Sequence, residues 1–278
     1  MFIVLGISVA VYFFQSLFKG FLPDLPVAIP IFLGTAISLL LSFMLNQSYE
    51  RWWEARQVWG SIVNDSRTLV LEVQAFLKPG NDAAIKVIAY RQIALCYSLG
   101  QSLRGKNAVD NIDEFLSEGE FAELQAHSNK ALALMSFHSR DLARYRNSGE
   151  LELFHHIQLD HTLVRLVESM GQAERIKKTV FPTMYPMFLH FLIYVFVIIL
   201  SISLSGIEGT FEIPLLICIM IPFLLLEKTA QYLQNPFSSL PTDTPVTEIA
   251  NTIEINLKQL IGDTNLPKPA EPNDYYID

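Results

Sequence analysis

Four stretches of the chain contain almost no charged residues and are long enough, or nearly so, to cross a lipid bilayer. They run from Phe2 to Phe18, from Val27 to Leu45, from Phe181 to Leu204 and from Phe211 to Leu226. A helix needs roughly 20 apolar residues to cross the hydrocarbon core, with a lower limit of about 17. The pattern therefore predicts an all-α integral membrane protein with four transmembrane helices.

The first two apolar stretches are predicted to form a helical hairpin. Between them lie Lys19, Gly20 and two prolines, Pro23 and Pro26, which favour a turn. A secretory signal peptide would need a basic segment before the apolar run and a small-residue cleavage site after it, and the sequence has neither. Because the chain begins almost inside the first stretch, we expect that an N-terminal segment is missing or mis-assigned.

The long segment between the second and third stretches reads as helical. Its apolar residues recur at three- and four-residue intervals, which is the spacing of one helix face. Turns are expected at Pro79-Gly80 and at Asn147-Ser148-Gly149. Another helix is expected from Val246 to Ile261, followed by a polar tail.

Basic residues set the expected orientation in the membrane. They flank the spans on the side of the middle segment and the C-terminal segment, and cytoplasmic loops carry an excess of Lys and Arg. We therefore expect a multi-pass protein of the cell membrane with both termini cytoplasmic. The predicted parts are transmembrane helices 1 and 2 (1–45), a cytosolic helical region (46–180), transmembrane helices 3 and 4 (181–226) and a cytosolic C-terminal helix and tail (227–278).

The second apolar stretch is the candidate functional element. No Pro or Gly occurs between Thr35 and Trp59, so the helix is expected to continue unbroken from the membrane into the cytosol. Thr35, Leu39 and Phe43 lie four residues apart and therefore share one helix face. They could form a hydrophobic constriction in a pore. Ordinary close packing of membrane helices through small residues such as Gly34 explains the same pattern, and periodicity does not separate the two.

The remaining residues offer little evidence for other chemistry. The net charge is −8 and no strongly basic block is present, so nucleic acid is not an expected partner. No phosphate-binding loop or hydrolase motif occurs, and no enzyme activity or cofactor is predicted. His156 and Asp160 are spaced to share a metal ion, but no second ligand pair accompanies them and no metal site is predicted. The spans also lack the buried acidic residues that are typical of proton-coupled transport.

Three groups of residues together resemble the bestrophin family, and the resemblance covers nearly the whole chain. They are Tyr49-Glu50-Arg51-Trp52-Trp53-Glu54-Ala55-Arg56 with Val58-Trp59-Gly60; Glu174-Arg175-Ile176 with Pro182 and Tyr185; and Asn235-Pro236-Phe237 with Asn251-Thr252-Ile253-Glu254. Each group is moderately specific by itself, and their order and spacing carry the resemblance.

The resemblance implies a homopentameric ion channel with a central pore in the lipid bilayer that passes small monovalent ions. It places the hydrophobic neck at Thr35, Leu39 and Phe43, and a second, cytosolic aperture at Phe154. Thr35 departs from the family pattern, in which a larger apolar residue is typical, so a wider or wetter outer end of the neck is expected. Family members conduct chloride and other anions, and bacterial relatives can prefer cations.

One departure from the family concerns calcium. Animal bestrophins bind Ca²⁺ with an acidic cluster directly after Asn-Pro-Phe, whereas here Asp243 is the one acid in that stretch. Because Ca²⁺ prefers six to eight oxygen ligands, no calcium gating is expected, and calcium titration during single-channel recording tests this. A non-conducting membrane scaffold and a small-solute transporter remain the alternative functions.

Overall fold

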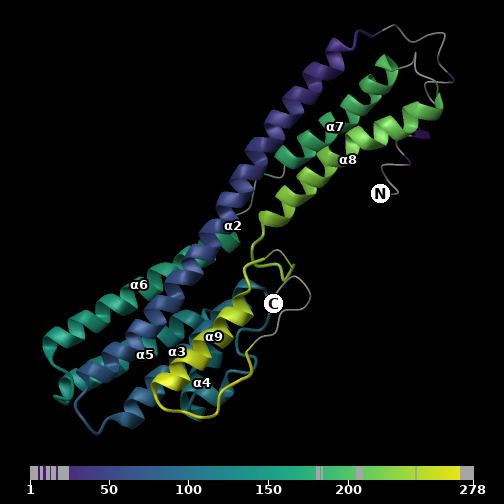
Figure 1. The fold of residues 1–278 in the computed structure, drawn as a ribbon. Helices are drawn as coiled ribbons and strands as arrows, with labels where there is room; N and C mark the ends of the chain where they lie inside the picture. The colour runs from purple at the N-terminus through teal and green to yellow at the C-terminus, as the bar shows by residue number, and fades with distance from the viewer. Residues whose placement is uncertain are drawn as a thin grey trace. The chain divides into compact units, whose positions relative to one another are not determined.

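The described residues of the computed structural model form helices and contain no strand, which confirms the predicted all-α class. They are residues 25–179, 184–204, 209–241 and 243–269, with the single positions Gly6, Val9, Ala10, Phe13, Leu17 and Pro182. The helices, labelled in Figure 1, are α2 (Ala28–Phe76), α3 (Asp82–Leu103), α4 (Glu118–Ala126), α5 (Lys130–Asn147), α6 (Leu153–Lys178), α7 (Met184–Ser203), α8 (Gly209–Leu233) and α9 (Val246–Leu260), with a 3₁₀ turn at Asp113–Phe115. Most of the predicted first helix, Phe2 to Phe18, lies outside the described residues.

The chain divides into two compact units, which are described separately. The first unit comprises Met1–Arg51 and Val180–Gln234, and the second comprises Trp52–Thr179 and Asn235–Asp278. Helix α2 is continuous for 49 residues and contributes its first part to one unit and its second part to the other. The expectation of an unbroken helix after Thr35 is confirmed, because α2 runs without a break from Ala28 through this segment to Phe76.

The first unit packs α2 against α7 and α8 around an apolar core. Ile37, Leu41 and Met44 of α2 are almost fully buried among apolar side chains that include Ile193 of α7 and Met220 of α8. These three α2 positions recur at helical spacing, so they present one stripe to the neighbouring helices.

Three helices among the described residues are long and apolar enough to cross a membrane, namely α2, α7 and α8. Helix α8 contains Pro214 and Pro222 and continues past the predicted end at Leu226 to Leu233. This extension places Glu227 inside the helix. The residues Glu212 and Glu227 are both only 3% exposed. The expectation that the spans lack buried acidic residues is therefore wrong, because the sequence could not show how far α8 extends or which of its faces is covered.

The second unit is built around α3, which packs against α5 and α9. Figure 1 shows α9 lying along α3, although the two helices are far apart in the sequence. The middle of α3, from Ile88 to Gly100, is buried nearly all round, which is typical of a central helix. Trp59 of α2 is completely buried in the same core.

The turns of the second unit lie where the sequence predicts them. Gly80 and Gly149 have φ values of +93° and +78°, a conformation that glycine adopts without steric cost. Helix α2 ends at Phe76 just before the first turn, and α5 ends at Asn147 just before the second. Ser117 begins α4 with a reciprocal capping box to Glu120, which satisfies two backbone donors at the start of that helix.

Candidate functional site

The three predicted neck residues lie on the uncovered face of α2. Leu39 and Phe43 are 58% and 57% exposed, and Thr35 is exposed as well. Ile37 and Met44, on the opposite side of the same helix, are buried against α7 and α8. The first unit therefore leaves an apolar stripe on α2 without a covering element among the described residues.

Small residues near the apolar stripe contribute to helix packing and to hydrogen bonds within α2. A side chain at Gly34 would place its Cβ 3.2 Å from Cε2 of Phe196, so glycine lets α2 and α7 approach closely. The hydroxyl groups of Thr35 and Ser38 donate to the carbonyl oxygens of Ile31 and Gly34, at 2.9 and 2.8 Å. Thr35 thus satisfies its donor within its own helix, and its oxygen remains able to accept a hydrogen bond from water.

Polar side chains follow the apolar stripe on the same helix. Asn46 donates to Oε1 of Glu50 at 2.9 Å, one helical turn later, and both residues are exposed. The exposed surface of α2 therefore changes from apolar to polar one turn after Phe43. Such a change is what the end of a membrane-buried or dewetted segment requires, since exposed amide and carboxylate groups need water.

Phe154, the predicted aperture residue, lies in the first turn of α6 in the second unit. Its side chain is 81% exposed, and the adjacent Leu153 and Ile157 are exposed too. The neighbouring His155 points the other way and stacks on Phe76, with ring centroids 4.3 Å apart and an angle of 2° between the planes. This stack fixes the start of α6 against the end of α2 while Phe154 projects from the second unit.

The described residues contain no cluster of three His, Cys, Asp or Glu side chains that could hold a metal ion. His156 and Asp160 therefore gain no third ligand among these residues.

A polar network inside the first unit was not found from the sequence. Nδ1 of His190 on α7 lies 2.9 Å from both carboxylate oxygens of Glu227 on α8. Nε2 of the same histidine bonds the hydroxyl of Tyr194 at 2.6 Å, and Gln231 donates to Glu227 at 3.1 Å. The two intrahelical pairs have i,i+4 spacing, which is visible in the sequence, but the contact between α7 and α8 joins residues 37 positions apart. The network satisfies a buried carboxylate, as its burial requires.

The second buried carboxylate of α8 is also satisfied. Ser201 of α7 donates to Oε1 of Glu212 at 2.6 Å. Both glutamates thus connect α7 with α8 through hydrogen bonds, and their burial is explained without a transport role.

The loop after α8 contains the buried carboxylate of Asp243. Oδ2 of Asp243 accepts hydrogen bonds from the backbone N–H groups of Ser238 and Leu240, the latter at 3.2 Å. Its Oδ1 is buried and has no hydrogen-bond partner in the described part of the chain. Burial raises the pKa of Asp243 above its ordinary value, and the backbone donors and Arg104 oppose that rise. The Asp243 carboxylate therefore stabilises the loop in which it lies. The absence of calcium gating stays a prediction.

Comparison with known proteins places the chain in a family. The family model described as bacterial/fungal bestrophin protein matches residues 1–259. The chain belongs to this bestrophin family. The match takes in α2 through nearly the whole of α9, and so both units contribute to it.

Named relatives in the family are channel-forming proteins. The chain is 30% identical over 245 residues to the voltage-dependent anion channel-forming protein YneE of Escherichia coli O157:H7, covering 88% of this chain and 80% of the relative. A voltage-dependent anion channel-forming protein of Ralstonia nicotianae is 28% identical over 249 residues, covering 88% and 81%. These relatives are channels rather than enzymes, and the chain is accordingly a membrane protein of a channel family.

Solved structures show the same fold. A bacterial bestrophin homologue from Klebsiella pneumoniae matches with a TM-score of 0.88 and 26% sequence identity, covering 94% of this chain and 97% of that chain. The resemblance to the bestrophin family that the sequence motifs indicate is therefore confirmed at the level of family and fold.

Proposed function

We propose that the chain is one subunit of a homopentameric ion channel and that α2 lines its pore. The observation that carries the proposal is the uncovered face of α2, where Thr35, Leu39 and Phe43 are exposed opposite the packed face. Exposed apolar side chains of this size need a cover or a dewetted space. Symmetry-related copies of the helix around an axis supply that space, and the family membership supports this arrangement.

In the proposed pore each of the three positions becomes a ring of identical side chains. Rings of Leu39 and Phe43 form an apolar neck in which water is unstable when the radius is small, and such a constriction gates by dewetting. The ring at Thr35 keeps hydroxyl oxygens that accept hydrogen bonds, so the neck is wetter at this end. Phe154 forms a separate aperture in the cytosolic region.

We propose anions as the permeant ions. The relatives named as anion channels support this, and the neck has no charged ring of either sign. Aromatic ring edges carry partial positive charge, so Phe43 edges that point toward the axis favour chloride. Glu50 lies beyond the neck and bonds Asn46; a dominant effect of its charge would instead favour cations.

The proposed topology follows the placement of basic residues. Residues 1–45 and 181–226 contribute the transmembrane helices, residues 46–180 and 227–278 lie in the cytosol, and both termini are cytoplasmic. The protein is placed in the cell membrane as a multi-pass protein whose partners are its own copies and the lipid bilayer.

The test is conduction by the purified protein in planar bilayers under a KCl gradient. The Phe43→Ala variant removes the largest side chain of the neck, so we expect a severalfold larger unitary conductance with a reversal potential that shows anion selectivity. Phe188→Ala is the matched control, because Phe188 is similarly exposed in the first unit but lies on α7. It is expected to conduct like the unmodified protein.

Other outcomes point to the alternatives. Silence from a folded, oligomeric protein would favour the non-conducting scaffold. Saturable flux of a solute coupled to an ion gradient would favour a transporter. A reversal potential of the opposite sign would keep the channel and overturn the proposed anion selectivity.

A further inference from the structure

Glu50 is an exposed acid on the same face of α2 as the proposed neck. It follows Phe43 by seven residues on a continuous helix, which is about two helical turns. Residues at this spacing point in nearly the same direction from the helix axis. Phe43 and Glu50 both belong to the first unit, and both are exposed. The carboxylate therefore lies directly beyond the apolar stripe, on the side toward which α2 leaves the first unit.

Asn46 holds the Glu50 carboxylate in place. Its Nδ2 donates to Oε1 of Glu50 at 2.9 Å, and the asparagine lies between Phe43 and Glu50 on the exposed side of the helix. An amide carries no net charge, so this hydrogen bond directs the carboxylate without neutralising it. The exposed carboxylate therefore keeps its full negative charge next to the neck.

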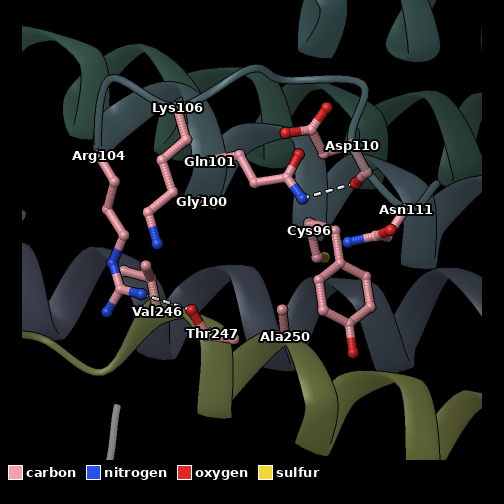
Figure 2. A pocket seen from close by; sticks show the side chains of 11 residues that line it. Cys96, Gly100, Gln101, Arg104, Lys106, Asp110, Asn111, Val246, Thr247 and Ala250 are labelled. Carbon is pink, nitrogen blue, oxygen red and sulfur yellow. Dashed lines mark hydrogen bonds between the residues drawn. The ribbon is translucent and has the colours of Figure 1, made fainter. Parts of the chain in front are cut away.

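No cation of the described chain balances this charge. Figure 2 shows a different arrangement in the second unit, where a cavity of about 190 Å³ is lined by Asp110 as well as by Arg104 and Lys106. Glu50, by contrast, forms no ion pair with any residue that the structure describes. Arg51 follows it in the sequence, but its Nε is buried, and consecutive side chains leave a helix about 100° apart. Glu50 thus presents an uncompensated charge on the exposed face of α2.

We propose that the Glu50 side chains of five copies form a ring of carboxylates at the cytosolic end of the neck. The inference rests on the proposed pentameric pore with α2 around its axis. Rings of Glu or Asp favour cations in channels, and low-dielectric walls beside a charged opening strengthen its field. The ring therefore lowers the chloride concentration at this mouth and opposes the anion preference proposed for the neck.

The position of the ring at one end makes conduction asymmetric. Thr35, at the other end of the neck, is uncharged and donates its hydroxyl hydrogen to Ile31 of its own helix. Chloride that enters past Thr35 reaches the neck without electrostatic opposition, whereas chloride that enters from the cytosol must first pass the carboxylates. Chloride therefore moves into the cytosol more readily than out of it, and the currents at equal and opposite voltages differ.

The test is single-channel recording of the unmodified protein and of Glu50→Gln in planar bilayers with KCl. Glutamine keeps an oxygen that accepts the Asn46 hydrogen bond but carries no charge. We expect Glu50→Gln to raise the ratio of chloride to potassium permeability about threefold or more, because several like charges act on each passing ion. We also expect it to make the currents at equal and opposite voltages nearly the same.

The salt dependence of the unmodified protein tests the ring without any substitution. The Debye length falls from about 10 Å at roughly 0.1 M salt to about 3 Å at roughly 1 M. A ring of charges is therefore screened at the higher concentration, and the asymmetry of the current should disappear there.

Two further variants separate charge from packing. Glu50→Asp keeps the charge and should keep most of the asymmetry and the selectivity of the unmodified protein. Glu118→Gln removes an exposed acid of α4 and should leave both properties unchanged. The mass of the assembly and the unfolding temperature verify that each variant is folded and assembled.

Failure of the ring and failure of the proposed pore give different results. Glu50→Gln channels with the reversal potential and asymmetry of the unmodified protein would overturn the ring and leave the pore in place. An asymmetry that persists at high salt would also overturn the ring. The shift caused by Glu50→Gln is measured relative to the unmodified protein, so it has the same sign whichever ion that protein prefers. Silence from the folded, oligomeric unmodified protein would overturn the pore and the ring with it.

Discussion

Gly34 shows how one residue serves the packing of α2. A Cβ at this position would lie 3.2 Å from the ring of Phe196, which is itself buried and packed edge-on against Phe223 at 5.5 Å. Gly60, on the same helix but in the second unit, has no atom within 4 Å of such a Cβ. The two glycines therefore differ in packing while they share the helical backbone.

This difference predicts opposite effects for the same substitution. Gly60→Ala should raise stability by about 0.5–1 kcal/mol, because alanine loses less conformational freedom than glycine on entering a helix. Gly34→Ala should give no gain or a loss, because the Phe196 ring must shift. Thermal unfolding of the two variants in the same detergent measures the difference. Equal stabilisation by both would show that α2 and α7 do not meet closely at Gly34.

Asp243 is a second position where one side chain organises its surroundings. Its Oδ2 accepts two backbone N–H groups, while its buried Oδ1 has no hydrogen-bond partner among the described residues. An asparagine can place its carbonyl oxygen at the Oδ2 position and keep both bonds. Asp243→Asn should therefore fold normally, whereas Asp243→Ala should lose about 1–3 kcal/mol because the backbone donors lose their acceptor.

The pH dependence of the same residue has a defined sign. Burial raises the pKa of Asp243 in the folded protein. The folded state then binds the proton more tightly than the unfolded state, so this contribution to stability is complete below the unfolded pKa and is lost as pH rises through the folded pKa. Chemical unfolding at a series of pH values should show this loss in the unmodified protein and not in Asp243→Asn. Parallel pH curves would contradict the assignment.

At the scale of helices, the second unit depends on a buried arginine. Arg91 of α3 pairs with Glu120 of α4 and, at 2.8 Å, with Asp141 of α5, and its side chain is almost completely buried. Arg140 and Glu123 join the same two helices, α5 and α4, at 3.0 Å, but both side chains are exposed. Both arginines thus link neighbouring helices of the second unit, but Arg91 does so in a buried environment and Arg140 at the exposed surface.

The two pairs should respond very differently to the loss of the arginine. Arg91→Leu leaves two partly buried carboxylates without their cation and should cost about 3–5 kcal/mol. Arg140→Leu breaks an exposed pair and should cost about 1 kcal/mol or less. Denaturant unfolding followed by circular dichroism compares them. A similar small cost for both would show that Arg91 is not a structural centre of the second unit.

For the whole molecule, the uncovered apolar face of α2 predicts an assembly. Leu39 and Phe43 are exposed in the isolated chain. In a channel whose subunits arrange α2 around a central axis, these two side chains would face the pore. Native mass spectrometry from mild detergent should show a homopentamer, five times the 31.5 kDa of one chain. A monomer would contradict the pore arrangement and leave the stripe as lipid-facing surface. The Leu39→Asn variant tests whether the mass of the assembly changes when the exposed apolar stripe of α2 becomes polar.

The sequence by itself determined the helices and the faces on which their residues lie. Hydropathy defined α2, α7 and α8 because a bilayer requires long apolar runs, and the turns followed from glycines such as Gly80 and Gly149, whose positive φ other residues rarely adopt. The spacing of Thr35, Leu39 and Phe43 placed them on one face, because helical geometry is local. Their exposure, and the burial of Ile37 on the opposite face, depended on what packs against α2.

Only the tertiary structure decided which distant residues meet. Packing between helices brings His190 to Glu227 and Arg91 to Asp141. A sequence pattern reports contacts one turn apart, whereas these pairs are separated by tens of residues and depend on how whole helices pack. For the same reason the buried acids of α8 were missed: a carboxylate is stable in such a position only when a partner on another helix satisfies it.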